Sequence, residues 1–330
     1  MFKVGLIGAG FMGGMHANCY KALGDKVEIA AIADVREENA KALAEGTNAA
    51  IYTSADELLK HPGLDFVDIC LPTYLHAEYV IKAMESGYNV FVEKPLCRTA
   101  EEAARIVEAS KKSGRIAQVG QVIRFWDEYV WLKELADSKK FGKIRTATFK
   151  RLSSYPDWAA DNWLHRFDMS GGMALDLHVH DIDFARYLMG EPKSVKASGI
   201  NNAEGLTQYI VTTYVYDGAV AVCEGTWNYP KEFGLTMAYV VEFEQATVVY
   251  NSGTGKFCIY HKDGGVENVE LTKSFDGDSD IGGNISSLGG YYNELEYFIK
   301  RLSDPSLPDI ASIEQGARSV ELALEGYSQL

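Results

Sequence analysis

Five short apolar runs alternate with helical patterns over the first 120 residues. The runs occupy residues 3–8, 27–34, 66–71, 90–93 and 116–120, and the helical patterns between them cover about 11–23, 36–45, 75–86 and 99–113. Nearly continuous apolar strands separated by helices are typical of a parallel sheet that is covered on both faces. The connections in such a sheet are right-handed crossovers. The pattern therefore predicts a doubly wound α/β domain over residues 1–120.

Residues 121–330 have a different pattern, which predicts a second domain of the α+β class. A helix at about 128–138 precedes a strand-like stretch at 143–152, an irregular aromatic segment and a helix at about 172–189. Six β-type runs follow between residues 194 and 271, separated by turn residues. Successive runs with this spacing favour a large, open, mostly antiparallel sheet that carries helices on one side.

The end of the chain combines a polar stretch with two helical patterns. Residues 275–290 are rich in Gly, Ser and Asp, which indicates a mobile loop. The two helical patterns cover about 291–302 and 313–328. We expect this closing region to pack back on the first domain.

The formal net charge of the 330-residue chain is −14, from 32 Lys and Arg against 46 Asp and Glu. This acidic balance disfavours nucleic acid and anionic membranes as partners, because both require clustered Lys and Arg. No stretch approaches the ~18 consecutive apolar residues of a membrane span, and the glycine-rich start does not resemble a signal peptide. The five widely spaced cysteines form no C-x-x-C pair, which indicates reduced thiols in a cytoplasmic protein.

A candidate dinucleotide fingerprint, Gly8-Ala9-Gly10-Phe11-Met12-Gly13, stands between the first apolar run and the first helical pattern. In a G-x-G-x-x-G motif the first glycine allows a tight turn, the second lets the backbone approach a pyrophosphate, and the third lets the helix pack closely on the strand. Asp34 ends the second run 21 residues beyond Gly13, where an acid accepts a hydrogen bond from a ribose 2′-OH. The alternative is a glycine-rich turn beside an unrelated surface aspartate.

Further motifs resemble those of the Gfo/Idh/MocA oxidoreductases, the family that includes glucose-fructose oxidoreductase and inositol 2-dehydrogenase. They are Pro72-Thr73-x-x-His76, Val92-Glu93-Lys94-Pro95, Gly171-Gly172 and Asp176-x-x-x-His180-x-x-Asp183. The resemblance covers essentially the whole chain. It implies a Rossmann domain, with Pro72, Thr73, His76, Glu93 and Lys94 near an NAD cofactor. It also implies a larger α/β domain whose open sheet forms oligomer contacts, so a homodimer or homotetramer is expected.

The motif Glu93-Lys94-Pro95 lies at the carboxyl end of an apolar run. Ligands of open α/β sheets bind at this edge, where Lys94 can donate a hydrogen bond to a substrate hydroxyl. The structural alternative is an ion pair between Lys94 and Glu93 at the end of the strand. The resemblance also allows a cis peptide before Pro95.

Asp176, His180 and Asp183 fall at positions i, i+4 and i+7 of a predicted helix, where His180 and Asp183 each lie within about 40° of Asp176 around the axis. The other positions of this helix are mostly apolar, so the polar stripe indicates a helix that faces a polar cavity or ligand. An imidazole can take an alcohol proton at neutral pH, and a nearby carboxylate can orient it. The alternative is a structural histidine with two capping acids. His178 points about 200° away from His180, so the two histidines do not share a metal ion and no metal is expected.

These motifs together predict an NAD(P)-dependent oxidoreductase that acts on a secondary alcohol of a sugar, cyclitol or nucleotide-sugar. His180, aided by Asp176, is expected to remove the hydroxyl proton while a hydride passes to the nicotinamide ring. Lys94 is expected to hydrogen-bond the same oxygen and stabilise its developing negative charge. Asp183 is expected to accept hydrogen bonds from a neighbouring hydroxyl of the substrate.

Four further residues complete the expected substrate site: Arg124, Tyr155, Trp163 and Tyr291. The resemblance places basic residues near Arg124, whereas Ile123 stands at a position that is basic in inositol 2-dehydrogenase, which disfavours inositol itself. The aromatic faces of Tyr155, Trp158 and Trp163 are suited to stacking on a sugar ring, although core packing explains them equally well. Tyr291 opens a helix that reaches the active site in relatives. His16 and His76 are expected to be hydrogen-bonding partners near the cofactor.

Two other functions compete with the dehydrogenase. Some relatives use bound NAD transiently to cleave glycosidic bonds, so an NAD-dependent glycoside hydrolase is the first alternative. A regulatory protein that binds NAD without catalysis is the second. Relatives of that kind tend to lose the lysine or the histidine, and both residues are present here as Lys94 and His180.

The sequence predicts that NAD binds more tightly than NADP. The carboxylate of Asp34 repels a ribose 2′-phosphate, and Arg36 offsets this only in part by pairing with such a phosphate. Titration of the purified protein with NADH and NADPH, followed by nucleotide fluorescence, should give the lower dissociation constant for NADH. Equal constants for the two cofactors would contradict the assignment of Asp34.

Overall fold

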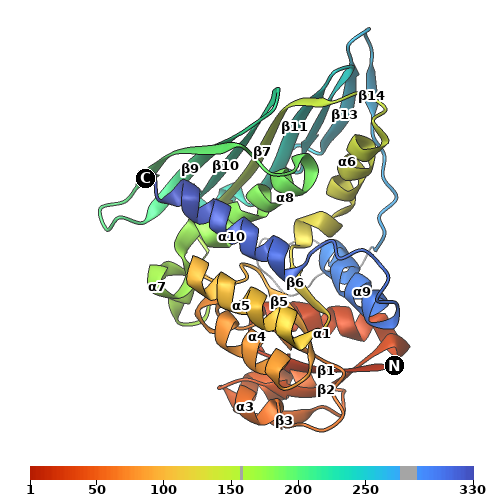
Figure 1. The fold of residues 1–330 in the computed structure, drawn as a ribbon, viewed down its shortest axis with the longest axis vertical. Helices are drawn as coiled ribbons and strands as arrows, with labels where there is room; N and C mark the ends of the chain where they lie inside the picture. Colours follow the sequence, from red (N-terminus) through yellow and green to blue (C-terminus); the bar gives the residue numbers. More distant parts are fainter. Residues whose placement is uncertain (157–158, 276–287) are drawn as a thin grey trace.

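The computed structural model describes residues 1–156, 159–275 and 288–330, which form two domains built on two separate sheets (Figure 1). Most of the expected loop at 275–290 lies outside the described residues, and so does Trp158. Within the described ranges, no helix is long and apolar enough to cross a membrane.

The first sheet has six parallel strands in the order β3-β2-β1-β4-β5-β6. They are β1 (Phe2–Ile7), β2 (Val27–Ala33), β3 (Ala50–Tyr52), β4 (Phe66–Ile69), β5 (Asn89–Glu93) and β6 (Ala117–Gly120). All four residues of β4 are buried, which explains why its sequence is a continuous apolar run. The strand order reverses between β1 and β4, and ligands of doubly wound sheets bind in the crevice at such a point. Only the edge strand β3 was not predicted.

Helices connect these strands on both faces of the sheet, and all of them except the short α3 coincide with predicted helical patterns. They are α1 (Phe11–Leu23), α2 (Glu37–Ala44), α3 (Ala55–Leu58), α4 (His76–Glu85) and α5 (Ala100–Ser113), with single 3₁₀ turns at η1 (Gly24–Lys26) and η2 (Thr73–Leu75). Local signals set the ends of α5. The Thr99 hydroxyl accepts the Glu102 N–H at 3.1 Å at its start, and Gly114 ends it with a left-handed φ of 63°.

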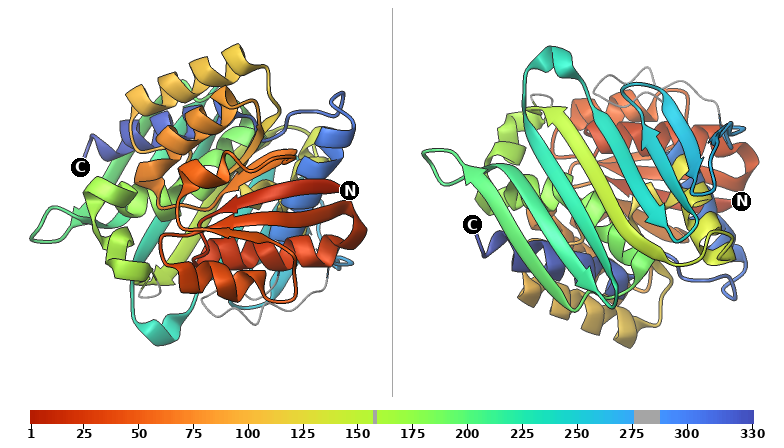
Figure 2. Two further views of the ribbon diagram at one scale, coloured as in Figure 1. Left: turned by 90° about the horizontal axis from the view of Figure 1, so that it is seen from below. Right: turned by 90° about the horizontal axis from the view of Figure 1, so that it is seen from above.

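The second sheet has eight strands in the order β14-β13-β12-β11-β7-β10-β9-β8. They are β7 (Ile144–Ser154), β8 (Ser194–Asn201), β9 (Thr207–Tyr216), β10 (Ala219–Tyr229), β11 (Thr236–Phe243), β12 (Ala246–Asn251), β13 (Lys256–His261) and β14 (Val266–Asn268). All neighbouring pairs are antiparallel except β7 and β10, which confirms the mostly antiparallel sheet. None of the described helices lies over one face of the sheet, as the right-hand view of Figure 2 shows.

Most of the remaining helical elements lie on the other face of this sheet or between the domains (Figure 1), and the 3₁₀ turn between β10 and β11 lies at the end of these strands (Figure 2). They are η3 (Val122–Phe125), α6 (Asp127–Ser138), η4 (Ala160–His165), α7 (Phe167–Ser170), the π-helical turn η5 (Ala174–His178), α8 (Val179–Met189), η6 (Lys231–Phe233), α9 (Gly289–Ser303) and α10 (Ile313–Tyr327). Helix α9 packs against α1, and α10 packs against both α5 and α8. The last two helices of the chain therefore join the two domains.

A buried ion pair holds η3, α8 and α10 together. The Arg124 guanidinium donates to both carboxylate oxygens of Asp183, at 2.7 and 2.6 Å, and the side chains are 0% and 1% exposed. The hydroxyl of Ser319 on α10 donates to the same carboxylate at 2.7 Å. The guanidinium also lies over the ring of Tyr187 and contacts Gln315. Both charges are therefore satisfied inside the protein rather than by a ligand.

Substituting Asp183→Asn should lower the free energy of unfolding by about 3–5 kcal/mol, because it leaves the charge of Arg124 buried without a partner. Denaturant titration followed by circular dichroism measures this loss. A matched control is Asp137→Asn, which removes an exposed partner of Lys133 on α6 and should cost about 0.5 kcal/mol or less. Similar losses in the two variants would show that the buried pair has no special role in stability.

Candidate active site

A cavity of about 650 Å³ opens at the carboxyl ends of the parallel strands and is lined by residues from both domains. Fourteen of the residues that the sequence assigns to the cofactor or the substrate line it: Gly8, Gly10, Phe11, Met12, Asp34, Arg36, Pro72, Thr73, Glu93, Lys94, Trp163, Asp176, His180 and Tyr291. Segments far apart in the chain thus meet at one crevice, which is the position expected for a doubly wound sheet.

The glycines of the fingerprint leave the space that a dinucleotide requires. A Cβ at Gly8, whose φ is +98°, would lie 2.5 Å from the carbonyl oxygen of Cys70. A Cβ at Gly13 would lie 2.0 Å from the carbonyl oxygen of Gly8, so this glycine permits close packing of α1 on β1 without lining the cavity. Gly10, in contrast, has open space around its Cβ position. The turn and the N-terminus of α1 therefore fit a pyrophosphate.

Asp34 follows β2, and the backbone holds its carboxylate in place. One oxygen accepts the Ala9 N–H and the other accepts the Arg36 N–H, both at 2.8 Å. The side chain of Arg36 reaches across the cleft and pairs with Asp161 of the second domain. This geometry presents the carboxylate at the end of the cavity where an adenosine ribose of a bound dinucleotide would lie.

Lys94 connects the two domains at the centre of the cavity. Its Nζ donates to the backbone carbonyl of Asp176 at 2.8 Å and to the carboxylate of Asp176 at 3.0 Å. Both side chains are 16% exposed, so the amine stays accessible from the cavity. The Lys94–Pro95 peptide is cis, as the resemblance allows. The structure therefore pairs Lys94 with Asp176, whereas the sequence left a pair with Glu93 open.

His180 lies on the first turn of α8 and lines the same cavity. Burial, together with the charges of Lys94 and Arg151, holds its pKa well below 6.5, so the imidazole is neutral at neutral pH. Among the described residues its Nδ1 has no hydrogen-bond partner. The sequence predicts that Asp176 orients this ring, but the carboxylate accepts a hydrogen bond from Lys94 instead. His180 is thus a neutral imidazole in the wall of the cavity.

Two residues assigned to the substrate from sequence lie elsewhere. Asp183 and Arg124 form the buried pair described above and do not line the cavity. The prediction that Asp176, His180 and Asp183 all face the cavity is therefore wrong for Asp183. Asp183 lies about 60° around α8 from His180, and a buried carboxylate at that angle reaches the guanidinium of Arg124 rather than the cavity.

Two other expected residues lie just outside the cavity. His76 is buried, with its ring nitrogens 2.8 and 2.7 Å from the carbonyl oxygens of Pro95 and Leu71, so it supports the loops that carry Lys94 and Pro72. Tyr155 lines a separate cavity of about 320 Å³ and packs edge-on against His165. Neither side chain reaches the larger cavity in the arrangement described here.

Several residues that line the cavity were not found from sequence, and Arg151 is the most informative of them. It is buried, and its Nε and Nη2 donate to the carboxylate of Asp181 at 3.0 and 3.1 Å. Alternation along β7 places it on the same buried face as Ala147 and Phe149. A charged residue at a buried register position is the signal that would have revealed it. Others are Trp126, Ser153, Ser154, Trp227 and Met237.

His178 and His180 point in different directions, as their spacing predicts. The Nε2 of His178 lies 2.9 Å from the hydroxyl of Thr212 on β9, whereas His180 lines the cavity. Two groups of described residues nevertheless have the composition of a metal site, and both contain His16. All five cysteines are free thiols.

In comparisons with known proteins, a part of each domain matches a protein family. Residues 2–121 match the family described as "Oxidoreductase family, NAD-binding Rossmann fold". Residues 129–250 match the family described as "GFO/IDH/MocA C-terminal domain". The two matches follow the order of the domains along the chain.

Individual relatives agree with these matches. The chain is 32% identical to myo-inositol 2-dehydrogenase of Thermotoga maritima over 234 residues, which are 68% of each chain. It is 40% identical to scyllo-inositol 2-dehydrogenase (NAD(+)) of Bacillus subtilis over 156 residues, 46% of this chain and 44% of the relative. A solved levoglucosan dehydrogenase, in complex with NADH and levoglucosan, has the same fold, with a TM-score of 0.87, 22% identity and coverage of 99% and 96% of the two chains.

The buried His178 should make the protein less stable in mild acid. Burial lowers its pKa to about 3, whereas in the unfolded chain it takes up a proton below about pH 6.5. The unfolded state therefore gains protons as the pH falls, which at pH 5 costs the folded state about 2 kcal/mol. Denaturant midpoints at pH 7.5 and pH 5 should differ less in His178→Gln than in the unmodified protein. An unchanged difference would mean that His178 is protonated in the folded state.

Proposed function

The chain belongs to the Gfo/Idh/MocA oxidoreductase family, and we propose that it is a dehydrogenase whose reaction centre is formed by Lys94 and His180. The observation that carries this proposal is geometric. Lys94 from the nucleotide-binding domain is bonded to Asp176 at the start of the segment that carries His180, and all three line one cavity. An amine and a neutral imidazole at the same site provide a hydrogen-bond donor and a base for one substrate hydroxyl.

NAD is the cofactor of this family's first domain, and its nicotinamide accepts or donates the hydride when it is bound. The turn from Gly8 to Gly13 and the N-terminus of α1 would hold its pyrophosphate. Asp34 would accept hydrogen bonds from the ribose hydroxyls. Glu93 and Lys94 line the opposite part of the cavity, near the second domain.

Three side chains have separate roles in the proposed oxidation: one accepts the proton, one stabilises the negative charge on the oxygen, and one orients the hydrogen-bond donor. Neutral His180 accepts the hydroxyl proton as the hydride leaves the carbon. The Nζ of Lys94 donates to the same oxygen and stabilises the negative charge that develops there. Asp176 holds Lys94 through its carbonyl and its carboxylate, which fixes the direction of the amine. Asp176 thus orients the lysine rather than the histidine.

We propose a sugar or polyol as the substrate class. The relatives and the solved structure named above act on inositols or bind levoglucosan, and all of these ligands are rings with several hydroxyl groups. The cavity combines the aromatic side chains of Trp163 and Trp227 with the hydroxyl-bearing side chains of Ser153 and Ser154. Aromatic faces and hydroxyl groups suit the apolar face and the polar edge of a sugar ring.

The quaternary structure and the location of the protein are further parts of the proposal. We propose a homodimer or homotetramer that associates through the uncovered face of the eight-stranded sheet (Figure 2). The five free thiols support a reducing compartment such as the cytoplasm. Analytical ultracentrifugation distinguishes a monomer from the proposed oligomers.

The experiment that tests the function is a substrate panel with NAD. Sugars, glycosides, inositols and linear polyols are each incubated with the protein, and the absorbance of NADH is followed. At least one should give NADH in proportion to the substrate consumed. Release of a free aglycone from a glycoside without net NADH would instead support the alternative of an NAD-dependent glycoside hydrolase.

Substitutions Lys94→Met and His180→Asn should each lower turnover on the best substrate by about 100-fold or more, because each removes a group that acts on the reacting oxygen. The dissociation constant for NADH should stay within about threefold of the original value, since the glycine turn is untouched. Matched controls are Lys82→Met and His261→Gln, which change partly exposed residues far from the cavity. Unchanged turnover in Lys94→Met or His180→Asn would remove that residue from the mechanism.

A further inference from the structure

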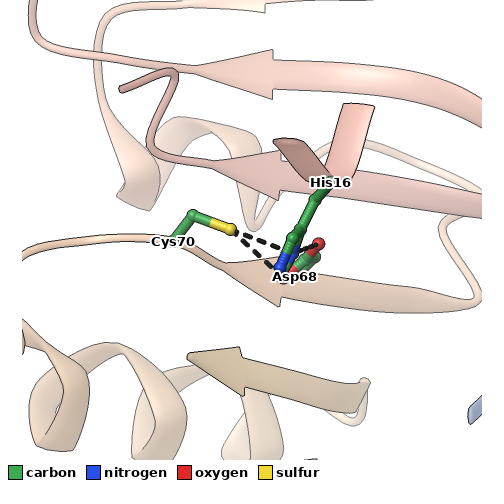
Figure 3. Close-up of side chains that lie close together, drawn as sticks. All are labelled: His16, Asp68 and Cys70. Carbon is green, nitrogen blue, oxygen red and sulfur yellow. Dashed lines mark hydrogen bonds and ion pairs between the residues drawn. The ribbon is translucent and has the colours of Figure 1, made fainter. Parts of the chain in front are cut away.

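A buried hydrogen-bond chain connects the nucleotide-binding helix α1 to the loop that carries Lys94. His16 lies on α1 and is completely buried, and its side chain reaches Asp68 on β4, with Cys70 just beyond the end of that strand (Figure 3). On its other side the ring reaches Glu93, the last residue of β5. The proposed reaction does not use His16, so its role is open.

Each ring nitrogen of His16 faces a carboxylate. Nδ1 lies 2.8 Å from Asp68 and Nε2 lies 3.0 Å from Glu93. Ionised carboxylates only accept hydrogen bonds, so this arrangement suits a ring that donates from both nitrogens, an imidazolium. The Sγ of Cys70 also lies 3.2 Å from Nδ1. Burial alone would lower the pKa of His16, but the charge of Asp68 raises it well above 6.5. Hydrogen bonds between charged partners of this kind are short and strong.

Glu93 continues the chain to the catalytic lysine. Its second oxygen accepts the backbone N–H of Lys94 at 3.0 Å. Its first oxygen is the one that His16 contacts. A Cβ at Gly120 on the neighbouring strand β6 would lie only 3.1 Å from this oxygen, so the glycine leaves room for the carboxylate. The position of the Lys94 backbone is therefore tied through Glu93 to His16 and α1.

The acidic side chains around His16 explain why a positive charge stabilises this part of the protein. Asp68 also accepts the hydroxyl of Tyr20 at 2.8 Å. Glu294 on α9 lies close to Glu93 and His16, and in the described part of the chain neither of its carboxyl oxygens has a hydrogen-bond partner. Burial and the charge of Glu93 hold the pKa of Glu294 well above its ordinary value, so it is neutral at neutral pH. Without the imidazolium, Glu93 would be an ionised carboxylate buried among other acids.

We propose that His16 is a positioning residue for the reaction, acting as a buried imidazolium that fixes Glu93 and, through it, the loop of Lys94. The inference rests on the proposed role of Lys94 as a hydrogen-bond donor to the substrate. It also connects the two ligand sites, because the helix that holds His16 begins at the pyrophosphate turn. A small displacement of a group that touches the reacting atoms costs about 100-fold in rate.

The protonation of His16 is tested on the intact protein without any substrate. Nitrogen-15 NMR of histidine-labelled protein, in complex with NADH, distinguishes an imidazolium from either neutral tautomer. The signal is assigned by its absence from His16→Gln or, if that variant does not fold, by its couplings in the unmodified protein. Two protonated ring nitrogens that persist up to pH 8 are the expected result. A neutral ring at pH 7, or a stoichiometric metal ion found by elemental analysis, would overturn the proposal.

The link to Lys94 is tested with three variants and one control. His16→Gln and Glu93→Gln should each lower kcat by about 10- to 100-fold, while KM for the substrate and the dissociation constant for NADH stay within about threefold. The double variant should lose no more than the worse single variant, because both changes break the same chain. The control is His61→Gln, which changes a histidine that bonds Tyr52 at the other end of the domain and should leave kcat unchanged.

The outcomes separate this inference from the proposed function. Additive losses in the double variant, or a kcat of His16→Gln within threefold of the original, would refute the positioning role and leave the dehydrogenase intact. If the unmodified protein oxidises no substrate, the proposed dehydrogenase function is refuted, and the NMR result still determines the charge of His16. If His16→Gln does not fold, Glu93→Gln alone must reproduce the loss of kcat with unchanged NADH binding, and a failure to do so refutes the proposal.

Discussion

The proposed active site depends on one contact between the domains, the pair of hydrogen bonds from Lys94 to Asp176. Lys94 lies at the carboxyl end of β5, where a parallel sheet presents its ligand-binding edge, and Asp176 lies in the π-helical turn that leads into α8. Each domain alone supplies only part of the chemistry. Because the amine is bonded to the segment that carries His180, Lys94 and His180 are held at the same cavity.

The polar side chains of α8 have two different roles: some form buried ion pairs, and His180 lines the cavity. Asp181 and Asp183 are fully buried and each forms a two-point pair with an arginine, Arg151 and Arg124 respectively. These pairs satisfy charges that would otherwise destabilise the core. His180 is different, because it borders the cavity and forms no ion pair among the described residues. A side chain that lines a cavity can contact a ligand, whereas its buried neighbours are held by their arginine partners.

Much of this organisation was predictable from the sequence, and the failures have physical causes. Apolar runs and glycines located the central strands and the nucleotide turn, because a strand buried on both faces tolerates few polar residues. The edge strand β3, only three residues long and only partly buried, gives no such signal. Spacing along a helix could not show that Asp183 would meet Arg124, since that depends on how separate elements pack. Arg151 was missed because a basic residue in a strand usually faces solvent.

The central claim is that Lys94 and His180 act on the same substrate oxygen, and a crystal structure of the ternary complex with NADH and a substrate from the panel tests it most directly. The claim predicts one ring hydroxyl within about 3.2 Å of both Lys94 Nζ and an imidazole nitrogen of His180, with its carbon facing the nicotinamide. A substrate hydroxyl that reaches only one of these groups, or a sugar bound outside the cavity, would contradict it.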